Sequence, residues 1–262
     1  MEAVLLGTGT GVPSARRAPA GLLVRALGGT LLLDAGAGTA TRLAQAGASL
    51  ATLDAVLFSH LHVDHVGDLG PMLSALRNPQ GPTRSAPLRL YGPTGFADHL
   101  VKLRALHGRW VEPRCAVDVH ELAGGERLAL GPFTVEPVRV EHAPDLVCLG
   151  YRVRSPGPGA GGRGRVLAYS GDARPCEALV ALLRGADLAV VECTFPDGGA
   201  GKAAHLEAAQ AGAAAARAGV PRLVLTHLSP AADAARPLIV AQVQNVYRGE
   251  IIQGEDGAVI TL

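Results

Sequence analysis

Residues 58–68 read FSHLHVDHVGD and place three histidines and two aspartates in eleven positions of a chain that has nine histidines in 262 residues. The run LDAVLFS just before the first histidine predicts a buried strand that ends where the histidines begin. On extended chain, His60 and His62 should point the same way, since they are two residues apart. Asp64 and His65 follow where the chain turns into a predicted helix. This one segment could therefore serve two neighbouring metal sites.

Three later segments offer further candidate ligands close to the end of an apolar run. His142 lies in VRVEHAPD, Asp172 in LAYSGDAR and His227 in LVLTHLSP. Imidazole and carboxylate suit zinc or similar divalent ions. With the first segment they make five histidines and two aspartates, enough for two metal ions, and a carboxylate such as Asp172 could bridge both. Singly, each could be an ordinary polar residue at a strand end, but clustering so many titratable groups without a metal is costly.

Composition narrows the class of protein. Hydrophobic residues make up 48% of the chain and aromatic residues 3%, so Leu, Val and Ala must fill the core. No apolar run reaches the roughly 18 residues of a membrane helix, and no signal peptide pattern opens the chain, so we expect a soluble cytoplasmic protein. The four cysteines are widely spaced and are expected to be reduced. A net charge of +1 lacks the signature of a protein that binds nucleic acid through its whole body, although local basic patches are allowed.

Glycines and prolines divide the chain into short apolar runs that predict strands, namely AVLL, GLLVRAL, TLLLDAG, LDAVLFS, LRLYG, FTVEPVRV, LGYRV, RVLAYSGD, LAVVE, RLVLTH and AVITL. Helical patterns lie between several of these runs, at residues 39–46, 68–77, 94–107, 177–183, 205–218 and 232–246. The segments TLLLDAGAGTATRLA and VLAYSGDARPCEALV echo each other, because each passes from an apolar strand through an Asp beside a Gly into a helix. We therefore expect two similar halves packed sheet to sheet in one domain, residues 1–262. Residues 77–87 and 155–164 are predicted to be flexible, the second as a hairpin loop.

The motif HLHVDH resembles the HxHxDH signature of the metallo-β-lactamase superfamily, and the later His, Asp and His follow in the same order. This resemblance covers nearly the whole chain. It implies an α+β fold, an αββα sandwich in which two mixed β-sheets pack face to face with helices on both outer faces. It also implies a dinuclear site in which His60, His62 and His142 hold one ion, Asp64, His65 and His227 hold the other, and Asp172 bridges. Zinc is expected, with manganese or iron as alternatives.

The chemistry that this resemblance implies is hydrolysis. Superfamily members that use two iron ions for redox reactions typically carry a Glu where this chain has His62. Two divalent ions about 3.5–4 Å apart can lower the pKa of a water between them from about 15.7 to about 7 and clamp the oxygens of an in-line displacement. That chemistry suits phosphodiesters and also esters or lactones. The opening LLGTGTGVPS is followed by ARRAPAG and no helix, so it lacks the context of a dinucleotide-binding loop.

Several segments look like the RNase Z branch of the superfamily, namely GTGTGVPS, LLLDAGAGT, Gly150 with Tyr151, ECTF and LTHLSP. In that branch the residue matching Asp34 lies near the metals, and a histidine matching His205 works with the residue matching Glu192 to protonate the leaving group. The candidate catalytic residues are therefore Asp64, His205 and Glu192. His205 is also expected to open a helix whose N-terminal amides favour a phosphate oxygen. An exposed histidine without a catalytic role is the alternative.

The chain also departs from RNase Z. Only 29 residues separate His142 from Asp172, too few for the long tRNA-binding arm that RNase Z inserts there. The loop PSARRAPA lacks the Lys and Asn of that branch, and AHLE replaces its His-Ser-Thr. The resemblance thus favours a small phosphodiester or cyclic phosphate over tRNA as substrate, and it allows a homodimer. A lactonase, carboxylic-ester or thioester hydrolase with the same metals is the nearest alternative. A non-hydrolytic metal-binding accessory protein of biosynthesis is another.

The remaining basic residues and histidines are interpreted as surface or packing residues. Arg16 and Arg17 could contact a phosphate at the rim of the site, but exposed, solvated side chains are expected. The basic stretch KLRALHGRWVEPR is interpreted as the outer face of a helix, with a nucleic-acid-binding stripe as the alternative. For Trp110 within it, a packing role is expected over stacking on a base. Three histidines have no visible partners and are assigned to the surface or to packing: His99, His107 and His120.

Overall fold

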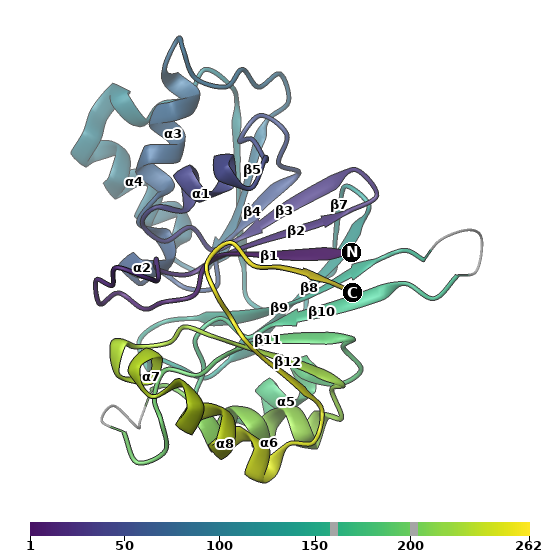
Figure 1. Cartoon of the computed structure of the whole chain (residues 1–262). Coiled ribbons are helices and arrows are strands. Elements are labelled where there is room, and N and C mark those ends of the chain that lie inside the picture. The colour runs from purple at the N-terminus through teal and green to yellow at the C-terminus, as the bar shows by residue number, and fades with distance from the viewer. Residues whose placement is uncertain (158–161, 200–203) are drawn as a thin grey trace.

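Two β-sheets pack face to face with helices on both outer faces (Figure 1). The computed structural model describes residues 1–157, 162–199 and 204–262. Each sheet contains seven strands and mixes parallel with antiparallel pairs. The predicted αββα sandwich is therefore confirmed.

The elements follow the expected order. In spatial order the first sheet contains β14 (Val259–Thr261), β1 (Glu2–Gly7), β2 (Gly21–Ala26), β3 (Gly29–Leu33), β4 (Ala55–Leu57), β5 (Leu88–Pro93) and β6 (Val117–Leu122). The second contains β13 (Glu250–Gln253), β12 (Arg222–Thr226), β11 (Leu188–Glu192), β10 (Arg165–Tyr169), β9 (Cys148–Ser155), β8 (Phe133–Val140) and β7 (Leu128–Leu130). The first sheet is covered by α1 (Thr39–Gln45), α2 (Val63–Val66), α3 (Leu69–Arg77), α4 (Phe96–His107) and the 3-10 helix η1 (Gly108–Val111). The second is covered by α5 (Glu177–Leu183), α6 (Ala208–Ala218), α7 (Pro230–Ala234) and α8 (Arg236–Val246).

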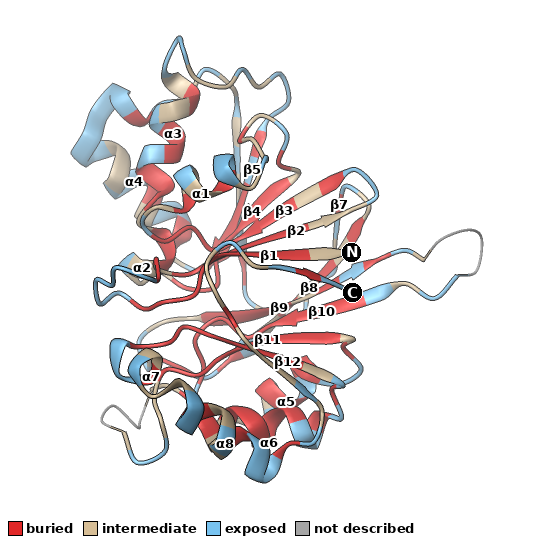
Figure 2. Ribbon diagram, in the orientation of Figure 1, coloured by how far each residue is buried: buried red, intermediate tan, exposed pale blue. Residues whose placement is uncertain are grey.

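Alternation along the strands divides the apolar side chains between three cores. On β3, Leu31 and Leu33 lie in the core between the sheets, whereas Leu32 packs under the helices of the first sheet. On β12, Val224 joins the central core and its neighbours Leu223 and Leu225 pack under the helices of the second sheet. The inner strands of both sheets, such as β3 and β12, are thus buried on both faces (Figure 2). Because both sheets contribute to the central core, we still expect residues 1–262 to act as one domain.

Strand direction brings the candidate site residues to one end of the sandwich. β8 and β10 run the same way because both pair antiparallel with β9, and β10, β11 and β12 are parallel. The segments after β8, β10 and β12 therefore lie together at one end of the second sheet, where these strands end. The segment after β4 in the first sheet reaches the same place, beside α2 (Figure 1).

Two predicted helices differ in their bounds. The pattern at residues 232–246 is interrupted, because α7 ends at Ala234 and α8 begins at Arg236 with a proline near its first turn. The helix predicted from His205 begins at Ala208, since the Glu207 side chain caps it together with Gln210. His205 thus lies before the helix. The first turn of α6 is already capped, so the predicted phosphate site at its N-terminal amides is wrong.

Three strands have no counterpart among the apolar runs: β6, β7 and β13. β6 reads VDVHEL at the edge of its sheet, where polar residues alternate with apolar ones. Of the two stretches predicted to be flexible, 77–87 contains Arg84, which donates to the carbonyls of Leu50 and Pro87. The stretch 155–164 joins β9 to β10 as the predicted hairpin connection, and its residues 158–161 lie outside the described residues.

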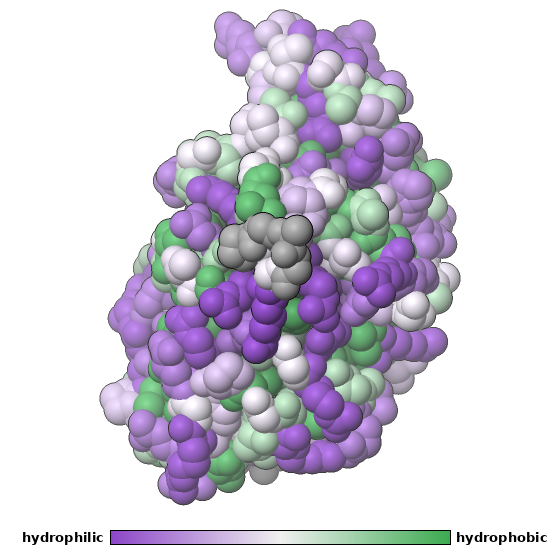
Figure 3. Space-filling model, turned by 90° about the vertical axis from the view of Figure 1, so that its right-hand side faces the viewer, coloured by the Kyte–Doolittle hydropathy of each residue, from purple (hydrophilic) through white to green (hydrophobic). Residues whose placement is uncertain are grey.

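The opposite end of the sandwich carries both termini and the β9–β10 hairpin. Hydrophobic residues on that face are scattered among hydrophilic ones (Figure 3). Within the described part of the chain, no helix has the length and apolar character that crossing a membrane requires. All four cysteines lie in described segments and are unpaired, with Cys148 and Cys193 buried.

Candidate metal centre

The first group of candidate ligands consists of His60, His62, His142 and Asp172. His62 Nδ1 lies 2.9 Å from His60 Nε2 and 3.3 Å from His142 Nε2. Asp172 Oδ2 lies 3.7 Å from His60 Nε2 and 3.8 Å from His142 Nε2. Ligand atoms that share a tetrahedral zinc ion at about 2.0–2.1 Å lie about 3.3 Å from one another. The spacing of these four side chains therefore fits one shared divalent ion.

The second group consists of Asp64, His65 and His227. Asp64 Oδ2 lies 3.4 Å from His227 Nε2 and 3.9 Å from His65 Nε2. The same aspartate, Asp172, borders this group too. Its Oδ1 lies 3.3 Å from His65 Nε2 and its Oδ2 lies 3.4 Å from His227 Nε2. All seven residues predicted from the sequence are thus brought together, and Asp172 lies between the two groups.

Two unpartnered buried atoms mark the same place. His65 Nε2 and Asp172 Oδ1 are buried without a hydrogen-bond partner, although they face each other. A buried polar atom without a partner costs free energy, so such atoms usually signal an ion or a ligand. Nitrogen and carboxylate oxygen are the donors that borderline divalent ions prefer. The residues present therefore fit divalent metal binding.

The other ring nitrogen of four histidines is fixed by neighbouring groups. Ser59 Oγ donates to Asp34 and so accepts from His60 Nδ1 at 3.0 Å. Thr194 Oγ1 donates to Glu192 and so accepts from His227 Nδ1 at 2.9 Å. Two further Nδ1 atoms donate to oxygen, from His65 to Asp34 at 2.8 Å and from His142 to the Ala204 carbonyl at 2.6 Å. In each ring this leaves Nε2 facing the other candidate ligands, the arrangement of a histidine that binds a metal through Nε2.

Asp34, which directly follows β3, accepts several of the hydrogen bonds that hold the site together. Its Oδ2 accepts from His65 Nδ1, from Ser59 Oγ at 2.8 Å and from the Tyr169 hydroxyl at 2.7 Å. Its backbone has a φ of 58° and His227 has a φ of 55°, so two of the three non-glycine residues with positive φ in the described chain belong to this site. Such conformations cost about 1–3 kcal/mol each and persist where the surrounding structure enforces them. Asp34 lies next to the metal cluster, as the sequence resemblance implied.

Burial and close packing shift the pKa values of the candidate ligands. Burial, with help from His65, holds the pKa of His60 well below its usual value. Burial acts the other way on Asp172, but His227 and His65 outweigh it and hold the pKa of that carboxyl well below its usual range. His60 is therefore neutral and Asp172 ionised near pH 7. Metal binding needs both in that form.

The glycine before Asp172 has a structural reason. Gly171 has a φ of 57°, and a Cβ on it would lie 2.7 Å from the Cβ of Ser59. The two sheets approach too closely here for any other residue. The Gly-Asp pair thus lets the bridging carboxylate and the histidine segment meet.

His205 lies at the rim of the cluster and pairs with Glu192. Its Nδ1 lies 3.1 Å from Glu192 Oε1 and 3.8 Å from Asp172 Oδ2. Burial lowers the pKa of His205, but the hydrogen bond and charge of Glu192 raise it above the usual value of 6.5. The His205 side chain is 22% exposed. It can therefore carry a proton and reach a ligand.

Glu192 itself has no capacity left for a metal ion. It is fully buried. Its Oε1 accepts from His205 and from the Ala173 amide at 2.7 Å. Its Oε2 accepts from Thr194 Oγ1 at 2.7 Å and from the Leu206 amide at 3.1 Å. Glu192 therefore orients the His205 ring, and its negative charge favours the protonated form of that ring.

A cavity of about 290 Å³ opens onto the cluster. Its walls include ligand residues of both groups, His205, hydroxyls and two apolar side chains, Val12 and Phe195. Among residues 1–157, 162–199 and 204–262, no lysine or arginine lines it. Selectivity beyond the metals must come from shape and hydroxyl groups.

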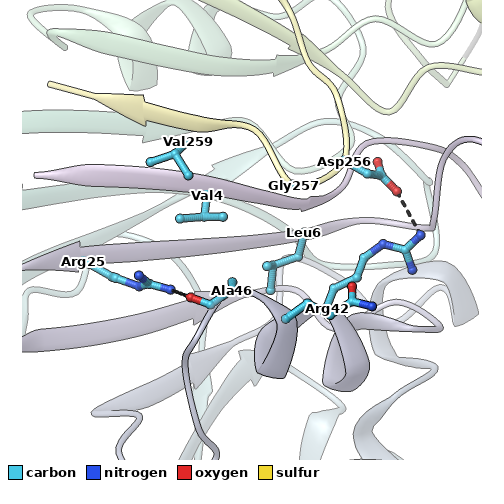
Figure 4. A pocket seen from close by; sticks show the side chains of 9 residues that line it. Val4, Leu6, Arg25, Arg42, Ala46, Asp256, Gly257 and Val259 are labelled. Carbon is cyan, nitrogen blue, oxygen red and sulfur yellow. Dashed lines mark hydrogen bonds and ion pairs between the residues drawn. The ribbon is translucent and has the colours of Figure 1, made fainter.

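The loop between β1 and β2, which carries Thr10–Val12 into this cavity, is anchored from the other side by Asp256. Its carboxylate accepts from the Thr8 and Ala18 amides at 2.9 Å and 2.7 Å. Arg42 of α1 lies 3.3 Å from the same carboxylate (Figure 4). Figure 4 shows a second hollow on the outer face of β1, which contains none of the candidate ligands.

Arg17 of this loop differs from its prediction. Its side chain is 1% exposed, lies 2.8 Å from Asp233 and donates to Thr8 Oγ1 at 2.6 Å. The expectation of an exposed, solvated Arg17 is therefore wrong, and its guanidinium points away from the cavity into an ion pair with α7. Arg16 is exposed, as expected.

Residues 30–228 match the family described as "Beta-lactamase superfamily domain". The chain belongs to the metallo-β-lactamase superfamily of metal-dependent hydrolases. Ribonuclease Z of Mycobacterium sp. (strain KMS) is 35% identical over 258 residues, which cover 88% of this chain and 85% of that protein. Ribonuclease Z of Myxococcus xanthus (strain DK1622) is 32% identical over 308 residues, with 100% of this chain and 98% of that protein covered.

Solved structures share the superfamily fold. The metallo-β-lactamase fold protein YhfI from Bacillus subtilis superposes with a TM-score of 0.82 at 24% identity, with 99% of each chain covered. The short form of human tRNase Z gives a TM-score of 0.77 at 25% identity, with 100% of this chain and 99% of that chain covered. A diphosphatase from the PhnP family gives 0.71 at 20% identity, with 100% and 97% covered.

Replacing Asp34 with asparagine should weaken metal binding by this superfamily member about 10–100-fold. Asparagine keeps one acceptor oxygen but loses the negative charge, and its NH2 group cannot accept from His65 Nδ1–H, so it orients the ring less well than Asp34 does. Competition with a chelator measures the affinity, and Asp54→Asn, at a turn carboxylate remote from the histidines, serves as the control. Unchanged metal affinity in Asp34→Asn would show that the aspartate only supports the fold.

Sequence reasoning missed several groups that orient the histidines. Ser59, Thr194 and the Ala204 carbonyl all fix a ring nitrogen. Ser59 adjoins the motif and Thr194 lies in ECTF, so their positions were visible in the sequence, but their partners were not. Asp68, the last acidic residue of the motif, begins α3 and accepts from the Ala40 amide at 2.7 Å, which is a structural role.

Proposed function

We propose that this superfamily hydrolase is a dinuclear phosphodiesterase that cleaves a small phosphodiester or cyclic phosphate. The observation that carries the proposal is the His205–Glu192 pair at the wall of the cavity, next to the residue that borders both ligand groups. An alkoxide leaves a phosphodiester poorly unless it gains a proton. His205, with its raised pKa and partial exposure, is placed to supply that proton.

The ligand assignment follows the two groups. His60, His62 and His142 would hold one ion, Asp64, His65 and His227 the other, and Asp172 would be shared. When bound, the two ions would lower the pKa of water and neutralise charge that develops on the phosphoryl oxygens. Zinc suits this nitrogen and oxygen set best, and manganese or iron are the alternatives. Asp64 lies at the open side of the cluster with a side chain that is 15% exposed, where it can also orient the attacking water.

A small substrate is supported by the size of the cavity and by the chain between His142 and Asp172. The cavity of about 290 Å³ is near the lower end of the range for small-molecule sites. The β9–β10 hairpin and its flanking loops take up all 29 residues between His142 and Asp172, which leaves no room for an inserted arm. The alignment with the Myxococcus ribonuclease Z spans 308 residues against 262 here, so that relative has segments that this chain lacks.

A lactone or carboxylic-ester hydrolase is the second candidate. The cavity lining favours it in one respect, because the described residues provide Val12 and Phe195 and no lysine or arginine to meet a phosphate. The tetrahedral intermediate formed from an ester or lactone carries less negative charge than the phosphoryl group of a reacting phosphodiester, so it needs a cationic side chain less. The same metal cluster could serve either reaction.

A substrate panel tests the proposal. The protein loaded with zinc or manganese would be assayed on bis(p-nitrophenyl) phosphate, on 2′,3′-cyclic nucleotides, on a series of lactones and on a tRNA precursor with a 3′ extension. We expect the highest kcat/KM on a small phosphodiester or cyclic phosphate. Preference for a lactone would favour the second candidate, and preference for the tRNA precursor would give this chain the activity that names its relatives. No turnover of any substrate would support a non-hydrolytic role.

A further inference from the structure

A groove on the helical layer of the first sheet collects arginines around the one tryptophan. It lies between the C-terminal end of α3 and η1 and has a volume of about 520 Å³. Seven residues line it: Ser74, Arg77, Asn78, Pro79, Arg109, Trp110 and Arg114. None of them lines the cavity at the metal cluster. The volume falls in the range of small-molecule sites.

Two arginines of the groove form hydrogen bonds with backbone carbonyls, not with carboxylates, in the described part of the chain. Arg77 Nη1 donates to the Glu112 carbonyl at 3.3 Å, and Arg114 Nη2 donates to the Asn78 carbonyl at 2.7 Å. Both acceptors are neutral backbone groups. By contrast, Arg174 and Arg217 are paired with the carboxylates of Glu141 and Glu177. Within the described residues, no carboxylate lines the groove or pairs with its three arginines, so an anionic ligand would complete it.

Trp110 is the exception among the aromatic side chains. The chain has nine of them, and all four tyrosines and all four phenylalanines are buried or half-buried, whereas Trp110 is 62% exposed. The predicted packing role for Trp110 is therefore wrong. The Arg109 guanidinium carbon lies 4.9 Å from the centre of its ring and holds it by a cation–π contact. An exposed, oriented indole beside arginines offers a surface on which a planar ring can stack.

We propose that this groove binds a nucleotide unit, with the base stacked on Trp110 and the phosphate held by Arg77 and Arg114. Arginine forks match the geometry of phosphate oxygens, and a nucleobase matches the indole. A free mononucleotide and a segment of single-stranded RNA share this chemistry. The groove lies at the far end of α3 from the ligand segment, about 13 Å along a helix of nine residues. It is therefore a site separate from the metal cluster and does not depend on the reaction proposed there.

Trp110 provides the measurement, because it is the one tryptophan and any change in tryptophan emission arises in the groove. The whole protein would be titrated with AMP and with a 12-nucleotide single-stranded RNA, which is checked to be intact afterwards. We expect saturable quenching that weakens as salt rises, by about 0.7 in log K per log salt for each phosphate contact. Quenching by both ligands identifies a mononucleotide site, and quenching by the RNA alone identifies single-stranded RNA as the source.

Variants test the two parts of the groove by fluorescence anisotropy of labelled ligand, which does not depend on the tryptophan. Trp110→Ala should weaken binding at least about fivefold through lost stacking, and Arg114→Ala about tenfold through the lost phosphate contact. Arg154→Ala, at an exposed arginine on β9 in the other sheet, is the matched control and should change binding less than about twofold.

Three results would contradict the proposed nucleotide site. Absence of quenching by both ligands at millimolar concentration would show that no nucleotide binds. Binding that is the same in Trp110→Ala and Arg114→Ala as in the unaltered protein would place the ligand elsewhere. An acidic peptide that binds as tightly as the RNA would show that the groove selects charge alone.

Discussion

Replacing Asp172 with asparagine should reduce hydrolysis at least about 10³-fold and lower the metal content of each chain. Loss of a group that only orients a metal ligand already costs about 10–100-fold, and Asp172 faces both ligand groups directly. Asparagine keeps the shape but removes the negative charge and one acceptor. Without that charge, five histidines would surround the ions with only Asp64 to balance them.

The measurements are turnover of the best substrate and metal per chain for the same preparations. Asp118→Asn, at an exposed aspartate on β6, is the matched control and should match the unaltered protein in both. An Asp172→Asn variant that keeps its metal and stays within about tenfold of normal turnover would remove Asp172 from the site.

Replacing His205 with alanine should lower kcat on substrates with poor leaving groups by about 10²–10⁴-fold, the usual contribution of a proton donor. Metal content should not change, because His205 lies at the rim and its Nδ1 is occupied by Glu192. The loss should shrink on bis(p-nitrophenyl) phosphate, whose leaving group needs little protonation. His120→Ala, at an exposed histidine that stacks on Tyr91, is the control. Equal losses on good and poor leaving groups would show that His205 is not the proton donor.

The pH dependence of kcat provides a second test of the role of His205. Glu192 raises the pKa of His205 above 6.5, so the proton is present below that raised pKa and lost as the pH rises through it. The kcat on poor leaving groups should therefore fall on the alkaline side. Replacing Glu192 with glutamine removes the charge and should move this fall to lower pH. A profile that is the same in both proteins would leave Glu192 with a purely structural role.

The arrangement of the histidine motif could be predicted from the sequence, because backbone geometry fixes the directions of side chains that are close together in an extended chain. Residues two apart on extended chain share a direction, so His60 and His62 had to point together, and the strand ends brought His142, Asp172 and His227 to the same edge. The superfamily resemblance supplied the grouping of ligands. The fold followed from the same strand and helix pattern, apart from polar or very short edge strands such as β6 and β7.

What the sequence could not show depends on partners that are far apart in the chain. Arg17 is buried because it meets Asp233, which is 216 residues away. Tyr169 reaches Asp34 across 135 residues, and no spacing rule reveals such a pair. The start of α6 was open to prediction, since Glu207 and Gln210 have the spacing of a capping pair. Trp110 looked like a packing residue because large aromatic side chains usually are.

The central claim is that seven side chains hold a pair of divalent ions between the two sheets. Anomalous diffraction at the zinc edge, from crystals grown with zinc, tests it most directly. We expect two peaks about 3.5–4 Å apart, one among His60, His62 and His142, the other among Asp64, His65 and His227, with Asp172 touching both. Peaks held by other residues, or none between these two groups, would contradict the claim.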